Sequence, residues 1–463
     1  MDKELFRDIL REYGLILNRR SVDFFSANSF NALASDWKQY LRVIPVELLV
    51  LYVNSKLSGS ECVPPSLKIL KSQLEKLEYS RKCVQSPKDL WRAWTGTVKE
   101  DVKEEFQNVT SSNGLVGKRI KAKKQHEIDR IVELISQIQV FQQEKSDPID
   151  SLVDIGAGVG HLSRIISLRN KLAVMAVEGN RQFTLAANFL DKKLLSAGIG
   201  SPIETTPIRF TTFVTEELSL KVDDFAANSA ILVGLHCCGD FSSTILKVFL
   251  KSRKAKALVL FGCCYHKEFQ SFHFLKTPLI GDGANEEHKT VAVFPLSQKW
   301  SDFELSYVLR EAACHNNENL AKRYTKENLD ISRYARAYLE KWIWQITNKP
   351  EDRNIGMCSV NCVENETTFE EYIRKAMAKR GNHLIEKLLE IIPKYELSTF
   401  VSVLRSSEFD SFDILKSMFA PAIESAITDD RLEFLRENGI TAKVVPLFEP
   451  SISPRNLAIV AYK

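Results

Sequence analysis

The sequence predicts an α/β protein in which a mostly parallel sheet carries helices on both faces. Three observations predict it: short apolar runs alternate with helical stretches from residue 151, a glycine-rich turn follows the first run, and the chain ends in a helix and two apolar runs joined by a long loop. Strands that alternate with helices indicate a parallel sheet, because each crossover helix returns the chain to the same edge.

The composition fits a folded protein of several domains. The chain has 463 residues, 44% hydrophobic and 26% charged, which excludes collagen-like and low-complexity proteins and predicts two or three domains. A net charge of +4 is too balanced to indicate a nucleic-acid binder by itself. Nine cysteines and a mixed-charge start predict a reducing intracellular location, cytoplasmic or nuclear. The longest apolar stretch, 44–53, is too short for a membrane span, so we expect none.

Helical patterns precede the predicted sheet. Residues 1–116 are expected to form an N-terminal helical region, in which Leu67, Leu70, Leu74 and Leu77 recur at helical spacing. The core is expected over 117–300. It begins with a basic segment and a helix whose apolar face holds Ile128, Ile131, Leu134, Ile135 and Ile138.

Five apolar runs are the expected parallel strands, at 151–155, 172–177, 208–214, 230–235 and 257–261. A helical insertion over 301–425 follows, with amphipathic helices at 368–379 and 383–392. Residues 426–463 are expected to complete the core with a helix at 430–438 and an antiparallel hairpin of strands 443–448 and 457–462. This order is that of the Rossmann-like seven-stranded methyltransferase sheet; the alternative is a separate C-terminal helical domain with an unattached hairpin.

The glycine-rich turn is the sharpest motif in the sequence. Gly156, Gly158 and Gly160 have the spacing G-x-G-x-G, whereas dinucleotide sites have G-x-G-x-x-G. With Asp154 before it, this turn suits S-adenosylmethionine: Asp154 can accept from the ammonium or orient the loop. Glu178 closes the second strand and can accept hydrogen bonds from both ribose hydroxyls. The alternative is that the glycines only form a tight strand-to-helix turn.

Cysteines and histidines follow the fourth and fifth strands, in the segments 234–240 (Gly-Leu-His-Cys-Cys-Gly-Asp) and 262–266 (Gly-Cys-Cys-Tyr-His). Ligands bind outside the carboxyl ends of parallel strands, so both segments are expected beside the cofactor. His236, Asp240 and His266 are the candidates that orient or deprotonate the methyl acceptor. Cys263 and Cys264 can instead be inert pocket walls. Zinc is the third interpretation, but no C-x2-C knuckle occurs here, and we expect no bound metal.

One absence bears on the substrate. Enzymes that methylate exocyclic amino groups of bases usually carry Asn/Asp-Pro-Pro-Tyr/Phe after the fourth strand, where this chain has residues 236–240. The sequence therefore disfavours dimethylation of adenine N6.

The combined motifs resemble the methyltransferase-like protein 25 and 25B family, one branch of which is called ribosomal RNA adenine dimethylase domain-containing protein. The resemblance runs from about residue 20 to the C-terminus and implies a class I S-adenosylmethionine-dependent methyltransferase. It rests on the glycine loop, the two cysteine–histidine segments and three further segments: 123–127 (Lys-Lys-Gln-His-Glu), 294–297 (Phe-Pro-Leu-Ser) and 453–456 (Ser-Pro-Arg-Asn). The core is also similar to tRNA 2′-O-methyltransferases at the two strand ends.

The remaining candidates lie outside the glycine loop and the two cysteine–histidine segments. Lys124 and His126, or Glu127 beside them, can face the cofactor carboxylate or the substrate; the alternative is a solvated helix start. Basic residues at 251–256 can join the lysines at 123–124 in a stripe that contacts phosphate. Trp91 and Trp94 can stack on bases, although burial is the expected fate of both.

The sequence thus predicts an S-adenosylmethionine-dependent methyltransferase that acts on RNA, at a 2′-hydroxyl or a base. A protein side chain is the alternative substrate, and a non-catalytic cofactor-binding scaffold is the alternative function. Arg455 is expected to pair with Asp429 or Asp430 and hold the hairpin against the preceding helix.

Overall fold

A computed structural model describes residues 1–56, 62–102, 105–107, 120–198, 206–267, 294–315, 317–325, 328–329, 331–347 and 357–463. The chain divides into two compact units, each made from two segments. Unit 1 comprises Met1–Glu78 and Ser306–Ile423, and unit 2 comprises Tyr79–Leu305 and Glu424–Lys463. Within the described residues, no helix combines the length and the hydrophobicity that a membrane crossing needs.

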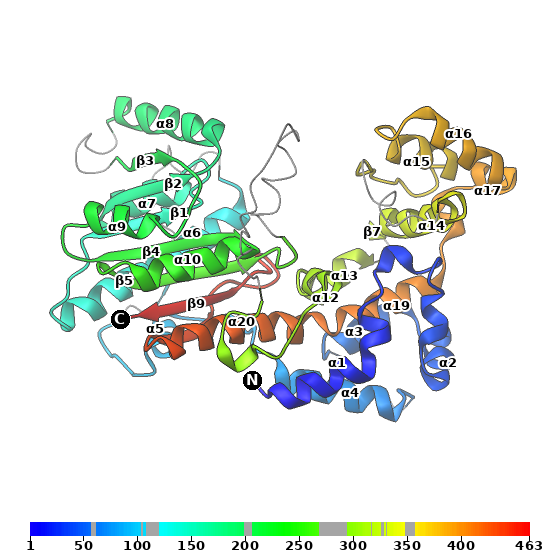
Figure 1. The fold of residues 1–463 in the computed structure, drawn as a ribbon, viewed down its shortest axis with the longest axis horizontal. Helices are drawn as coiled ribbons and strands as arrows, with labels where there is room; N and C mark the ends of the chain where they lie inside the picture. Colours follow the sequence, from blue (N-terminus) through cyan, green and yellow to red (C-terminus); the bar gives the residue numbers. More distant parts are fainter. Residues whose placement is uncertain are drawn as a thin grey trace, which may run out of the picture. The chain divides into compact units, whose positions relative to one another are not determined.

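Unit 2 contains the predicted seven-stranded sheet, in the order β3-β2-β1-β4-β5-β9-β8 (Figure 1). The strands up to β5 pair in parallel, and β9 pairs antiparallel with both β5 and β8. The final hairpin therefore completes the sheet, which confirms the predicted fold class. The strands are β1 (Ser151–Ile155), β2 (Ala173–Glu178), β3 (Ile208–Thr211), β4 (Ala230–Cys238), β5 (Ala255–Cys263), β8 (Thr441–Pro446) and β9 (Leu457–Tyr462).

Helices cover both faces of the sheet, and neighbouring residues of its central strands enter different cores. Leu152 of β1 packs with one group of helices, whereas Val153 packs with the other. The first group is α5 (Pro87–Thr95), α6 (Ala122–Glu144) and α7 (His161–Asn170); the second is α9 (Leu218–Phe225), α10 (Asp240–Lys251) and α20 (Ala420–Glu437). α8 (Arg181–Ser196) follows β2. The predicted apolar face of α6 is buried at all five positions.

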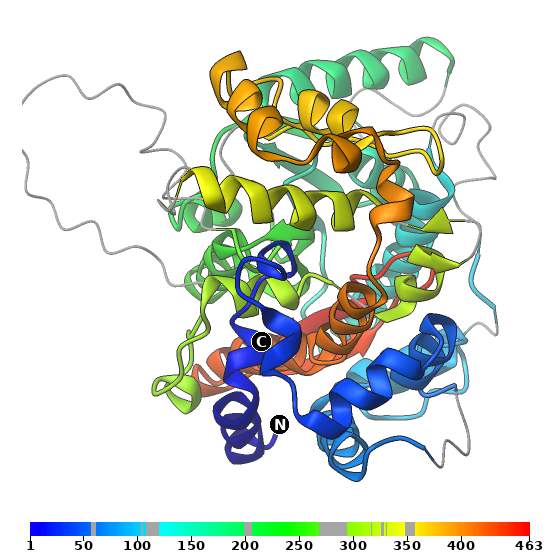
Figure 2. The ribbon, with the colours of Figure 1, turned by 90° about the vertical axis from the view of Figure 1, so that its right-hand side faces the viewer.

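Unit 1 is helical, and Leu67, Leu70, Leu74 and Leu77 are buried in it as their spacing predicts. Its segment Ile331–Ile391 folds back on itself, with the yellow to orange helices α14 to α16 packed together (Figure 2). Its elements are α1 (Lys3–Leu17), α2 (Ser35–Val43), α3 (Val46–Val53), α4 (Pro65–Leu77), α12 (Tyr307–Ala312), α13 (Leu320–Arg323), α14 (Ile331–Ile346), α15 (Phe369–Ala376), α16 (Asn382–Ile391), α17 (Lys394–Ser398), α18 (Val401–Leu404), α19 (Ser407–Ser417) and the strand pair β6 (Tyr324–Thr325) and β7 (Asn328–Leu329).

The last helix differs from its prediction. It was expected at 430–438, but α20 begins at Ala420, because Ile423, Ala426 and Ile427 continue its buried face toward the N-terminus. The expected boundary at 425 therefore falls inside a continuous helix, and the chain passes from unit 1 to unit 2 within it. At the other end of the chain, the structure groups Tyr79 and the residues that follow it with the sheet.

Candidate functional site

The glycine loop (residues 156–160) lies between β1 and α7 and is shaped by left-handed backbone. Gly156, Gly158 and Gly160 have φ values of 78°, 57° and 71°, which side-chain-bearing residues rarely adopt. A Cβ on Gly156 would lie 3.2 Å from the Phe241 ring, and one on Gly160 would collide with Arg209. At Gly158 no atom of the described residues lies within 4 Å of the Cβ position, so on that side these residues leave room for a ligand.

The two acidic residues of the predicted cofactor site bond to different parts of the chain: Glu178 to backbone around the loop and Asp154 to the Ser163 side chain of α7. Glu178 accepts the N–H of Gly158 on Oε2 and that of Asn180 on Oε1, each at 2.8 Å. Each carboxylate oxygen has two lone pairs, so both can still accept from the two hydroxyls of a ribose. Asp154 is 2% exposed and accepts from Ser163 at 2.5 Å, and burial raises its pKa. Gly158 and Glu178 fit S-adenosylmethionine, because its adenosine part needs a glycine turn that it can approach closely and a carboxylate beside that turn to accept from the ribose.

Two side chains beside the loop were not singled out by the sequence. Phe213 is 63% exposed, and its ring lies where a Cβ on Gly179 would contact it at 3.0 Å. Phe213 lies beside Gly179 because the Thr212 N–H donates to the carbonyl of Glu178 and so continues the pairing of β3 with β2. An exposed aromatic face next to Glu178 can stack on a purine. Burial, with the positive charges of Arg164 and Lys124, lowers the pKa of His161 to about 4.

A second group forms where β4 ends, and we call Glu127, His236 and Ser453 the Glu127 cluster. Glu127 Oε1 lies 2.8 Å from His236 Nε2 and accepts from the Ser453 hydroxyl at 2.7 Å. Glu127 is 1% exposed. Its burial alone would raise its pKa, but the hydrogen bond from His236, the imidazole's charge, Lys124 and Ser453 together lower it to about 2. The carboxylate is ionised and accepts only, so Nε2 of His236 carries a hydrogen and a neutral ring has its lone pair on Nδ1.

A bulge in β4 places His236 in this cluster. Gly234 pairs with Leu260 and Cys237 with Gly262, so β4 has one more residue than β5 over this stretch. His236 lies in the bulge with φ of 63°. The strand continues to Cys238, beyond the predicted end at residue 235, so His236 projects from the strand rather than from the turn after it.

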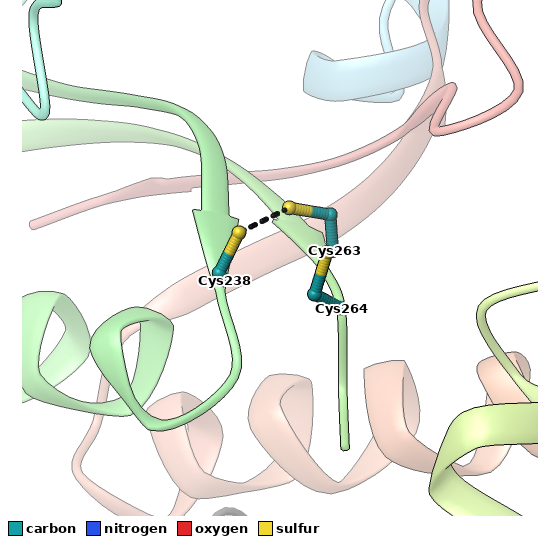
Figure 3. A group of neighbouring side chains, drawn as sticks. All are labelled: Cys238, Cys263 and Cys264. Atoms are coloured by element: carbon teal, nitrogen blue, oxygen red, sulfur yellow. Dashed lines mark hydrogen bonds between the residues drawn. The ribbon is translucent and has the colours of Figure 1, made fainter. Parts of the chain in front are cut away.

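Three of the cysteines meet at the ends of β4 and β5, and we call Cys238, Cys263 and Cys264 the thiol cluster (Figure 3). Their sulfur atoms all lie within 4.8 Å of one another, and Cys238 and Cys263 are 3.2 Å apart. The hydrogen bond from Cys263, with smaller contributions from Cys264, Lys267 and His236, lowers the pKa of Cys238 to about 6, whereas the pKa of Cys263 is raised.

The other predicted site residues occupy different positions. Nζ of Lys124 lies 3.6 Å from the Glu127 carboxylate, at the N-terminus of α6. His126 turns away and accepts the Glu449 N–H at 2.9 Å in the loop between β8 and β9. Asp240, 3% exposed, begins α10, and His266 is half-buried on the turn after β5. Of the Lys-Lys-Gln-His-Glu segment, Glu127 is thus the residue that contacts His236.

The expected basic stripe needs correction, whereas the expectation for the two tryptophans holds. Residues 251–256 lie where β5 begins, at the strand end opposite the cysteines, and Lys251, Arg253 and Lys256 pair with acidic residues. They therefore form no stripe with Lys124. The expected burial of Trp91 and Trp94 is confirmed.

Arg455 has the expected structural role, but its partner differs from the expected Asp429 or Asp430. It donates to Glu424 of α20 at 2.7 Å. Asp430 instead accepts from the backbone N–H groups of Leu296 and Ser297. Residues of the segments 294–297 and 453–456 thus both bond to α20.

Comparison with known proteins identifies the class of the domain. A family model described as "Methyltransferase domain" matches residues 123–269. The chain is 29% identical to the probable methyltransferase-like protein 25 of Homo sapiens over 322 residues, which cover 64% of this chain and 48% of that protein. The Mus musculus protein of the same name is 27% identical over 267 residues, covering 55% and 40%.

Among solved structures, magnesium protoporphyrin IX methyltransferase from Synechocystis with bound SAH is similar over 36% of this chain and 73% of that chain, with 13% identity and a TM-score of 0.21. The chain spans less than half the length of the two curated relatives. The chain carries a domain of the S-adenosylmethionine-dependent methyltransferase class and is related to the methyltransferase-like protein 25 family, as its motifs predict.

Proposed function

We propose that this chain, as a relative of methyltransferase-like protein 25, transfers the methyl group of S-adenosylmethionine to RNA at a position that must lose a proton. The observation that carries the proposal is the imidazole of His236, which Glu127 holds at 2.8 Å where β4 ends. β4 is the direct neighbour of β1, whose end carries the glycine loop. His236 is therefore our candidate general base, on the strand next to the one that leads into the glycine loop.

Methyl transfer then requires two things of the protein, to position the donor and to remove the acceptor's proton. S-adenosylmethionine supplies an already activated methyl group, and the loop with Glu178 holds the donor in line with the acceptor. His236 takes the acceptor's proton on Nδ1, while Nε2 keeps its hydrogen bond to Glu127. The ionised carboxylate stabilises the imidazolium that forms, and Ser453 holds the carboxylate in place. A sugar hydroxyl, or a ring nitrogen that carries a hydrogen, needs such a general base, because neither is a good nucleophile while it keeps its proton.

Positive charge beside the Glu127 cluster supports RNA as the substrate. Lys123 and Lys124 lie 3.7 and 3.6 Å from the Glu127 carboxylate, on the first turn of α6. Lys267 is exposed on the turn that follows the thiol cluster. Lysines near the general base can contact the phosphates that flank a target nucleotide, and such contacts position the nucleic acid without reading its sequence. The resemblance to tRNA 2′-O-methyltransferases at the two strand ends supports the same substrate class.

The test uses S-adenosylmethionine with a labelled methyl group, purified protein, and total RNA and protein from cells that lack it. Nuclease-sensitive label would support the proposal and allow the methylated nucleotide to be mapped. Label only in protease-sensitive material would mean that the acceptor is a protein side chain. Cofactor binding without transfer to either fraction would mean that the chain is a binding scaffold.

A separate measurement tests the cofactor site. Glu178→Ala removes the ribose acceptor and the partner of the Gly158 N–H. Hydrogen bonds to a charged group contribute about 1.5 to 3 kcal/mol each, so we expect S-adenosylhomocysteine to bind roughly 10- to 100-fold more weakly by calorimetry. Unchanged affinity in a folded Glu178→Ala protein would refute this assignment.

A further inference from the structure

The thiol cluster has a geometry that sequence spacing does not reveal. Cys238 and Cys263 are direct partners in the parallel pairing of β4 and β5, so their side chains stand next to each other. Cys264 would point to the opposite face if β5 continued as a regular strand. Its φ of 45° turns the chain instead, and its sulfur joins the other two within 4.8 Å. The pairing of two strands and the left-handed backbone of Cys264 thus bring three sulfur atoms together, although the sequence has no C-x2-C motif here.

We propose that Cys238, Cys263 and Cys264 bind a zinc ion and leave its fourth coordination position to water or to a substrate atom. Thiolates are the ligands that zinc takes most readily, and three protein ligands with one open position are typical of catalytic zinc sites. Among the described His, Cys, Asp and Glu side chains, no fourth ligand atom joins this group of three. Cys263 is buried, whereas Cys238 and Cys264 are partly exposed among the described residues.

The charge around the cluster fits a metal–thiolate group. Three thiols lose three protons to bind one Zn²⁺, so the group carries one net negative charge. Arg431 of α20 is 1% exposed, and its Nε and Nη2 have no hydrogen-bond partner among the described residues. Its Nη1 lies 2.9 Å from the Cβ position of Gly262, the residue directly before Cys263. The guanidinium lies 5.0 Å from the centre of the Tyr265 ring and interacts with the charge of Asp430, but neither bonds to Nε or Nη2. A buried guanidinium with unsatisfied nitrogens is costly, and a zinc–thiolate group beside Gly262 would add a compensating negative charge.

The zinc site stands independently of the substrate proposal, because metal binding can be measured without methyl transfer. The protein is purified with reductant, treated with a weak chelator and analysed for zinc by mass spectrometry. We expect one zinc per chain in the wild type. Cys238→Ser, Cys263→Ser and Cys264→Ser should each weaken zinc binding about 100-fold or more. Removing a residue that only hydrogen-bonds to a metal ligand already weakens metal binding by up to about 100-fold, and these variants remove a ligand itself.

Cys237→Ala is the matched control, because Cys237 is buried in the same strand next to Cys238 but its sulfur is not part of the cluster. It should retain zinc. Cobalt(II) bound to the wild type should show thiolate-to-metal charge transfer and the visible bands of tetrahedral coordination, a result that does not depend on whether a variant folds. Wild-type protein without zinc, or zinc that the cysteine variants keep as fully as Cys237→Ala does, would overturn the proposal. So would a cobalt spectrum without thiolate bands.

Discussion

The two halves of the site in unit 2 are built in different ways. The cofactor half, from Asp154 to Glu178, is one β-α-β segment whose key contacts run between a carboxylate and backbone N–H groups only 20 residues apart or fewer. The acceptor half joins Glu127, His236 and Ser453 through side chains that are 109 and 326 residues apart. The first half is local and the second is assembled by the fold.

The difference separates binding from chemistry. Changes in the cofactor half should act on cofactor affinity, because its groups hold the donor. Changes in the acceptor half should act on the transfer rate, because its groups handle the proton. The following predictions test whether this division holds.

The largest effect is expected at His236. We predict that His236→Asn lowers the rate of methyl transfer to RNA about 10²- to 10⁴-fold, the usual contribution of a general base, while S-adenosylhomocysteine affinity is unchanged. Asparagine tolerates the left-handed backbone at this position better than other residues do, so the bulge is preserved. His383→Asn, an exposed histidine of α16, is the control and should keep the wild-type rate. A wild-type rate in His236→Asn would place the base elsewhere.

The second prediction concerns acid stability. The pKa of Glu127 falls from 4.5 in the unfolded chain to about 2 in the folded protein, so the ionised carboxylate stabilises the fold above pH 4.5 and this contribution is lost as the pH falls toward 2. The shift corresponds to about 3 kcal/mol. We expect Glu127→Gln to be less stable than the wild type at pH 7 and the gap to narrow as the pH falls below 4.5, in denaturant unfolding. A gap that stays constant with pH would show that the Glu127 charge does not stabilise the fold.

The same contrast explains how much of the site the sequence predicts. The sequence could predict that Gly156, Gly158, Gly160 and Glu178 lie together, because a strand, a turn and the next strand fix their geometry within about 25 residues. The strand pattern and the terminal hairpin likewise predicted the sheet, because each strand carries its own apolar signal. Local chain geometry is sufficient for these features.

The acceptor half could not be predicted in this way. A bulge turns His236 toward Glu127, and the left-handed backbone of Cys264 brings its sulfur to that of Cys263. The residues with left-handed backbone are His236 and Cys264 themselves, and neither is a glycine that would predict this conformation. His126 and Glu127 are neighbours in the sequence, yet only Glu127 faces His236, because helix position decides which side chain points inward. These contacts depend on tertiary packing.

The smallest effect comes from a pair of glycines with matched backbones. Gly158 and Gly198 have φ values of 57° and 71°, and among the residues that the structure describes none has an atom within 4 Å of a Cβ placed on either glycine. Alanine should therefore cost each about 1 kcal/mol of folding stability through backbone strain alone. Only Gly158→Ala should also weaken S-adenosylhomocysteine binding, by roughly tenfold, because its methyl group fills the open turn beside Glu178. Equal affinity in the two variants, measured by calorimetry alongside thermal unfolding, would mean that the cofactor does not approach the backbone at Gly158.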